Sequence, residues 1–222
     1  MTHPEGSRAV KIGVLLPRQT DDLGEWLADA SAFEAAGADA LWVDFASEPE
    51  LDPLALTAAL AAVTVRPLLV TTLPTSDGPS EALARMLATI GRLSHGRLRI
   101  VTDAIPVGAL AETPVGGLAE TPVGGLADTR GGRLAEIVAG LGTFRRIPGD
   151  PEAFEHMREP DEVERWVSAS SPDGRATWRA TLRDAAESGA QGLVVPIGPR
   201  LLDILRNPDD PGHRRDLQLA QG

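Results

Sequence analysis

Short apolar runs alternate with amphipathic stretches through the first hundred residues of the chain. Four runs are mostly apolar, as expected for strands buried on both faces: 10–16, 40–45, 67–72 and 97–102. Three stretches between them repeat apolar residues at helical spacing: 22–37, 52–63 and 80–93. Because a helix separates each strand from the next, the connections are crossovers and the strands pair in parallel. The pattern predicts an α/β fold and leaves a closed barrel and an open doubly wound sheet as alternatives.

A short internal repeat interrupts this alternation. The octapeptide at 110–117 (LAETPVGG) recurs at 118–125 and, in degraded form, at 126–132. Its prolines and paired glycines oppose a long helix, and solenoid repeats are usually longer. We therefore predict a Gly/Pro-rich loop over 107–133, inserted in one domain that spans residues 1–222.

The second half of the chain carries a weaker pattern. It predicts helices at 134–141, 161–168, 176–188 and 199–206, and strands at 143–147 and 192–197. With the four runs of the first half, this makes about six strands.

Composition narrows the class of protein. With 42% hydrophobic and 24% charged residues, 222 residues suffice for one globular domain. The absence of cysteine excludes disulfides and thiolate chemistry, and a net charge of -11 makes nucleic acid an improbable partner. No apolar run approaches the ~20 residues of a membrane span, and the polar start lacks a signal-peptide core. We expect a cytoplasmic protein that binds neither membrane nor nucleic acid.

Two segments resemble the luciferase-like monooxygenase family, which uses a flavin or deazaflavin coenzyme. The first runs from Thr71 through the proline-led helix to the turn Ser94-His-Gly-Arg97 before the fourth strand. The second comprises Lys11-Ile-Gly-Val-Leu-Leu-Pro17 and Phe33-Glu-Ala-Ala-Gly-Ala-Asp-Ala-Leu-Trp-Val43. The resemblance implies a TIM-like (β/α) barrel, FMN or a deazaflavin at the carboxyl ends of the strands, and often a homodimer. Because the chain is shorter than full-length members, we expect an incomplete or truncated barrel.

Candidate site residues follow from where the predicted strands end. Barrel sites are built at the carboxyl ends of the strands, where Asp44 and Asp103 are candidate catalytic carboxylates. Six further residues at these ends are candidates for binding the coenzyme: Pro17, Arg18, Thr71, Thr72, Thr102 and Gly198. The four histidines show no metal-ligand spacing, so we expect no metal site.

Three functions remain open at this point. The first is a flavin-dependent oxidoreductase or monooxygenase acting on a small organic substrate. The second is a degenerate barrel without redox turnover, either a flavin- or ligand-binding protein or a partner subunit. The third is a cofactor-free isomerase, cyclase or lyase. Two family features are missing, namely the glycine-rich loop after the fourth strand and the luciferase histidine after the second strand. An open barrel would expose strand edges, which predicts a homodimer.

Overall fold

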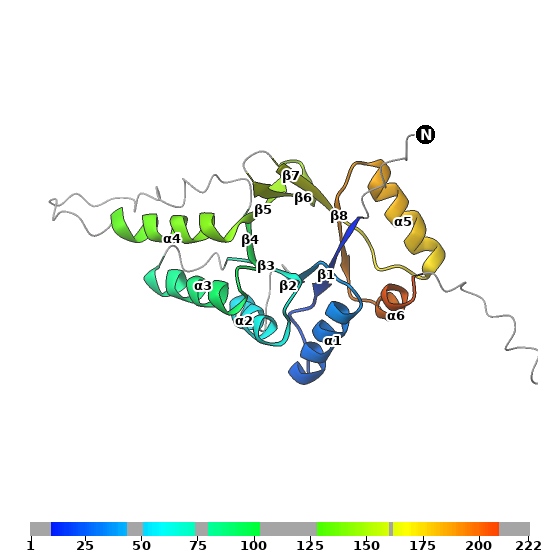
Figure 1. The fold of residues 1–222 in the computed structure, drawn as a ribbon, viewed down its shortest axis with the longest axis horizontal. Coiled ribbons are helices and arrows are strands. Elements are labelled where there is room, and N and C mark those ends of the chain that lie inside the picture. The colour runs from blue at the N-terminus through cyan, green and yellow to red at the C-terminus, as the bar shows by residue number, and fades with distance from the viewer. Residues whose placement is uncertain (1–9, 44–50, 74–79, 103–127, 160–161, 209–222) are drawn as a thin grey trace, which may run out of the picture.

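The computed structural model describes residues 10–43, 51–73, 80–102, 128–159 and 162–208, and in it eight strands close into a barrel (Figure 1). The strands are β1 (Lys11–Leu16), β2 (Ala40–Val43), β3 (Leu68–Thr72), β4 (Leu98–Thr102), β5 (Thr143–Ile147), β6 (Asp150–Glu159), β7 (Glu162–Ser168) and β8 (Gly192–Pro196). The helices are α1 (Leu23–Ala35), α2 (Pro53–Val63), α3 (Glu81–Leu93), α4 (Asp128–Leu141), α5 (Arg175–Glu187) and α6 (Leu201–Arg206). The predicted TIM-like α/β barrel is confirmed, and β8 closes it by pairing in parallel with β1.

Side-chain caps explain where the first three helices begin. The Asp22 carboxylate accepts hydrogen bonds from the backbone N–H of Gly24 and Glu25, at 2.7 and 3.1 Å, and starts α1. Asp52 and Ser80 cap α2 and α3 in the same way, through bonds of 2.8 and 3.1 Å. Each cap satisfies a backbone donor that has no partner inside its helix. These starts agree with those predicted from the sequence.

Two strands were missed in the sequence, and they change how the barrel closes. β6 runs antiparallel to both β5 and β7, so two hairpins stand where a regular barrel has crossover helices. The predicted helix at 161–168 is wrong, because residues 162–168 form β7. The predicted count of six strands is wrong for the same reason. The barrel is incomplete in its helices, while its ring of strands is complete.

The outer surface of this hairpin region shows why it needs no helix over it. Arg145 of β5 pairs with Glu155 of β6, and Arg165 of β7 lies 3.7 Å from Asp150. These charged side chains face outward, and none of the described helices covers β5, β6 and β7 in Figure 1. A polar outer face can remain in contact with water.

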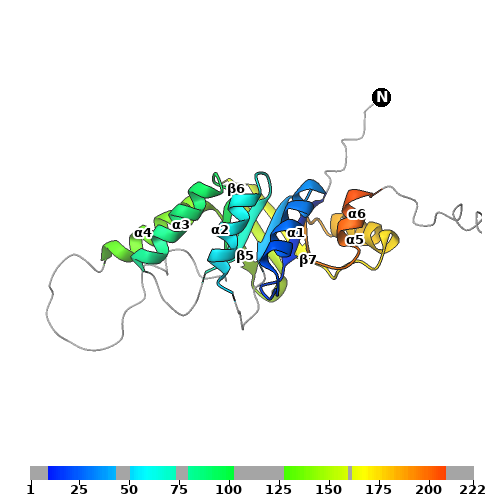
Figure 2. The ribbon, with the colours of Figure 1, turned by 90° about the horizontal axis from the view of Figure 1, so that it is seen from below.

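The helices cover the rest of the barrel. Viewed from below, α1, α2, α3 and α4 lie side by side along one flank (Figure 2), and consecutive members contact each other. Under α3 and α4, Leu87, Ile100, Leu134 and Val138 are buried in one cluster. A second cluster joins β1, β2 and β8 to α1, α5 and α6.

The start of α4 corrects the predicted repeat loop. α4 begins at Asp128, so the last six residues of the predicted 107–133 loop are helical. The rest of that prediction falls on 103–127, which lies outside the described residues. The buried side chains of Leu134 and Val138 anchor the helix on the barrel.

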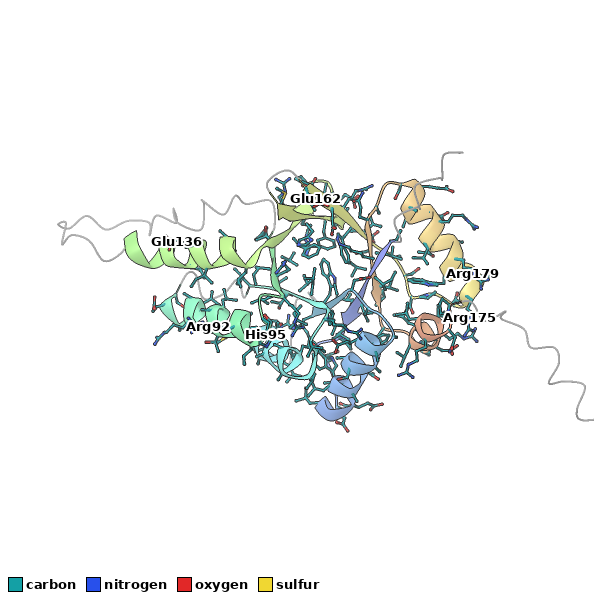
Figure 3. The ribbon with its side chains drawn as sticks, viewed as in Figure 1. Arg92, His95, Glu136, Glu162, Arg175 and Arg179 are labelled. Atoms are coloured by element: carbon teal, nitrogen blue, oxygen red, sulfur yellow. The ribbon has the colours of Figure 1, made fainter. Side chains whose placement is uncertain are left out.

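Aromatic side chains fill the interior of the barrel, as the sticks inside the ring of strands in Figure 3 show. Trp42 lies 4.7 Å from Phe144, 5.0 Å from Phe154 and 6.1 Å from Trp166, measured between ring centroids. None of the four is more than 2% exposed, and we call them the aromatic plug. A side chain at Gly192 would collide with the Trp166 ring, so glycine there makes room for the plug. The plug separates the two ends of the barrel.

Candidate functional site

The two ends of the barrel carry different chemistry. All strands except β6 run the same way, so their carboxyl ends meet at one opening, which we call the C-terminal mouth. The opposite opening, at the amino ends of these strands, is the N-terminal mouth. Sites in such barrels usually occupy the C-terminal mouth.

Of the predicted threonines, only Thr72 faces into the barrel. It pairs with Val101, which is buried in the same cluster as the aromatic plug, and paired residues share a face of the sheet. Thr71 pairs with Ile100 and is fully buried in the outer layer, beneath the helices. Thr102 pairs with the outward-facing Arg145, so it also lies on the outer face.

The remaining predicted binding residues hold the loops of this mouth together. Arg18 is 7% exposed and donates from Nε and Nη2 to the Leu51 carbonyl, at 3.3 and 3.1 Å. The Pro17 carbonyl accepts a 2.8 Å hydrogen bond from the Trp26 indole. Gly198 lies against the Ser171 hydroxyl, where any side chain at 198 would collide with it. Asp44 and Asp103, the predicted catalytic residues, lie outside the described residues.

Two inward-facing polar residues at the same mouth were missed. Arg146 pairs with the interior residue Phe154, and its guanidinium carbon lies 5.3 Å from the centre of that ring. It also donates a 3.1 Å hydrogen bond to the Pro151 carbonyl. Ser168 pairs with Val194, which is buried in the same cluster as the aromatic plug, so it too faces inward near the end of β7. The register of β5 and β7 decides that these two side chains face inward, and the sequence pattern does not predict that register.

A linked chain of polar groups lies at the N-terminal mouth, where the sequence indicated no site. Lys11 Nζ donates to Glu164 Oε1 at 2.6 Å, and His156 Nδ1 lies 3.5 Å from Glu164 Oε2. Arg99 Nε donates to His156 Nε2 at 3.3 Å. The His156 ring stacks on Phe144 with 4.4 Å between centroids. Since Nε2 accepts, the hydrogen-bond pattern fits a neutral His156 with its proton on Nδ1.

Burial and neighbouring charges set the ionisation of this chain. Burial lowers the pKa of His156, and the charges of Arg99 and Lys11 lower it further, against a partial opposing effect from Glu164. For Glu164, burial alone would raise the pKa, but the hydrogen bond and charge of Lys11 outweigh it and the pKa is lowered. Glu164 is therefore a carboxylate beside a neutral histidine at neutral pH.

The turn that carried the family resemblance has a structural role. Arg97 is 9% exposed, and its guanidinium donates to the carbonyls of Ser94, Thr64 and Pro67 at 2.8, 2.7 and 3.0 Å. His95, labelled at the end of α3 in Figure 3, has a φ of 52° and forms the turn. The turn ties α3 to α2 and β3 at the amino end of β4, so it supports the barrel at the mouth opposite the predicted coenzyme site.

Comparisons with known proteins give distant similarities in structure alone. No family model matches the chain, and no curated protein matches it. An EDTA monooxygenase from Chelativorans sp. BNC1 is similar with a TM-score of 0.40 and 18% identity, over 95% of this chain and 68% of the other. A tryptophan synthase chain from M. tuberculosis gives a TM-score of 0.41 and 15% identity, over 91% of this chain and 92% of the other. Neither similarity bears on function, and the barrel rests on its own strand pairings.

Two other kinds of feature are absent from the described residues. In the part of the chain that the structure describes, no helix is long and apolar enough to cross a membrane. Within the same ranges, no three His, Asp or Glu side chains gather as metal ligands would.

Proposed function

We propose that the chain is a flavin- or deazaflavin-dependent oxidoreductase of the luciferase-like class, acting on a small organic substrate at the C-terminal mouth. The observation that carries this proposal is that Thr72, Arg146 and Ser168 all face inward at one mouth, next to the buried aromatic plug. Polar groups converging over apolar walls are typical of small-molecule sites. The resemblance of the first hundred residues to the family gives the chemical class.

The residues at this mouth suit the chemistry of such a coenzyme. A guanidinium can hold a phosphate through two parallel hydrogen bonds, and we assign that role to Arg146. The hydroxyls of Thr72 and Ser168 can donate to or accept from the edge of a flavin ring. Arg18 suits the phosphate less well, because its side chain is buried on the Leu51 carbonyl. When bound, the flavin supplies the electron or hydride transfer, and the protein orients it.

We also propose Asp44 and Asp103 as the catalytic carboxylates. Asp44 directly follows the last residue of β2 and Asp103 directly follows the last residue of β4, and both strands end at the C-terminal mouth. A carboxylate there can accept a proton from a bound substrate.

The direct test is a pair of calorimetric titrations with FMN and with the deazaflavin coenzyme. We expect saturable binding with a Kd of about 1 μM to 100 μM for one of them. Arg146→Met should weaken binding about tenfold or more, because it removes a charged hydrogen-bond donor to the phosphate. Arg145→Met is the matched control, because Arg145 faces outward on the same strand and pairs with Glu155. No binding of either coenzyme, or equal effects of the two variants, would contradict the proposal.

One observation favours the flavin-free or non-redox alternative. The turn that best resembles the family stabilises the barrel rather than lining the proposed coenzyme site. A barrel can retain such a turn and be a ligand-binding protein, a partner subunit of another enzyme, or a cofactor-free isomerase, cyclase or lyase. Consumption of reduced coenzyme in the presence of substrates separates the alternatives: binding without turnover indicates a storage or partner role, and no binding indicates a cofactor-free barrel.

The assembly we propose is a homodimer in the cytoplasm. The sequence predicted a dimer from open strand edges, and this reason is wrong because the ring of strands is closed. A different surface now supports it, an apolar groove of about 630 Å3 between α2 and α3. Met86 and Leu93 of that groove are 46% and 48% exposed. Contiguous exposed apolar surface of this kind marks interaction sites, and a second copy is the occupant we propose.

A further inference from the structure

The N-terminal mouth contains a second cavity, far from the proposed coenzyme site. It has a volume of about 340 Å3, within the range of small-molecule pockets. Its lining is Lys11, Asp39, Leu68, Arg99, His156 and Trp166. The aromatic plug lies between this cavity and the C-terminal mouth.

Arg99 is the unusual group in this cavity, because its charge has no counter-ion in the described structure. Nη1 donates to the carbonyls of Gly96, Leu98 and Leu141 at 2.8 to 2.9 Å, and Nε donates to the neutral His156. Nη2 makes no hydrogen bond to any described residue, and no described carboxylate forms an ion pair with Arg99. Burial alone lowers the pKa of Arg99, with no contribution from a nearby carboxylate. A half-buried guanidinium without a counter-ion is costly unless an anion binds it.

The other charged groups in the cavity have partners within the protein. The Lys11 ammonium is paired with Glu164 at 2.6 Å. Asp39 Oδ2 accepts the backbone N–H of Ile12 at 2.7 Å. The carboxylates of Asp39 and Glu164 lie near the two cations, although neither forms an ion pair with Arg99, and their negative charge disfavours a dianion more than a monoanion. Only Arg99 Nη2 has no described partner, and it lies in a cavity that the apolar side chains of Leu68 and Trp166 also line. Such a site suits a monoanion that has an apolar body.

We propose that the N-terminal mouth is a binding site for a small organic monocarboxylate, whose carboxylate pairs with Arg99 and whose apolar part lies against Leu68 and Trp166. The carboxylate can accept charge-assisted hydrogen bonds from the N–H groups of Arg99 Nη2. The side chain of Lys11, 36% exposed, lies at the rim, where its remaining N–H groups can contact the same carboxylate. This site is independent of the proposed oxidoreductase activity, because it lies on the other side of the plug.

The test uses calorimetry on the full chain at fixed ionic strength, with benzoate, benzamide and inorganic phosphate as probes. Benzamide has the size and shape of benzoate without its charge. We expect benzoate to bind saturably with a Kd of about 1 mM or tighter, and benzamide at least about tenfold more weakly. Phosphate should also bind more weakly than benzoate, since it brings a second charge and no apolar surface.

Two variants locate the binding. Arg99→Lys keeps the charge but removes the planar guanidinium and its Nη2 donors, and we expect a loss of about tenfold in benzoate affinity. Leu68→Trp fills the cavity and should abolish binding, with circular dichroism confirming the fold. Arg146→Met, at the other mouth, should leave benzoate affinity unchanged. Equal binding of benzoate and benzamide, no binding of benzoate, or a loss caused by Arg146→Met alone would overturn the proposal.

Discussion

Stability should fall in mild acid because of one buried histidine, and His156→Gln should reduce that fall. His156 is 4% exposed and lies between Arg99 and Glu164, with Phe144 stacked on its ring. Burial, followed by the charges of Arg99 and Lys11, keeps its pKa below the usual 6.5. Glutamine is the appropriate replacement, because its amide can accept from Arg99 and donate to Glu164 without titrating.

The sign and size of the effect follow from proton linkage. The unfolded histidine takes up a proton near pH 6.5, whereas the folded one resists it, so the unfolded chain binds more protons below that pH. The free energy of unfolding then falls as the pH falls, by at most about 1.4 kcal/mol per pH unit from this one group. The lowered pKa of Glu164 adds a second loss below about pH 4.5, since the unfolded carboxyl protonates first. The window between about pH 6.5 and 5 therefore isolates the histidine.

Urea unfolding at several pH values between about 7 and 5 measures the effect. The wild-type free energy of unfolding should decline as the pH falls through this range. In His156→Gln the slope of this free energy against pH should be smaller, by most of the contribution of one titrating group. His95→Asn is the matched control, because His95 is exposed in the turn after α3 and asparagine tolerates its positive φ of 52°. Equal slopes for wild type and His156→Gln, or a flattened slope for His95→Asn, would refute this reasoning.

Three further substitutions test the packing, the turn and the assembly. Gly192→Ala should cost about 1–3 kcal/mol in chemical denaturation because its methyl group meets Trp166, whereas Gly140→Ala, in open space on α4, should be neutral or stabilising. Arg97→Met should cost at least about 2 kcal/mol, since it leaves several buried carbonyls without donors, and a smaller loss would contradict the structural role of the turn. Met86→Glu should give a monomeric mass by light scattering, while Met157→Glu, on the outer face of β6, should not; a monomeric wild type would exclude the dimer.

The first half of the fold follows from the sequence because local signals and burial agree there. Apolar runs buried on both faces predict β1 to β4, and the caps at Asp22, Asp52 and Ser80 mark the helix starts. β7 was missed because its pattern is inverted: Glu164 faces inward at 4% exposed while Val163 faces outward at 46%. A strand with a charged inner face lacks the alternation that identifies strands.

The site was only partly predictable for a related reason. The sequence predicts Thr72 at the C-terminal mouth because it lies at the end of its strand. In the structure its side chain faces inward. Arg146 and Ser168 depend on the register of the β5–β6–β7 hairpins, which a one-residue slip would reverse. The cluster at the N-terminal mouth joins Lys11 to Glu164 across 153 residues, and no local pattern encodes such a pairing.

Crystal structures of the chain grown with FMN, and in parallel with the deazaflavin coenzyme, would show whether and where the protein binds a coenzyme. We expect coenzyme density at the C-terminal mouth, with its phosphate on Arg146 and its ring near Thr72 and Ser168. Coenzyme density at the N-terminal mouth, or none at either mouth at saturating coenzyme, would contradict this expectation.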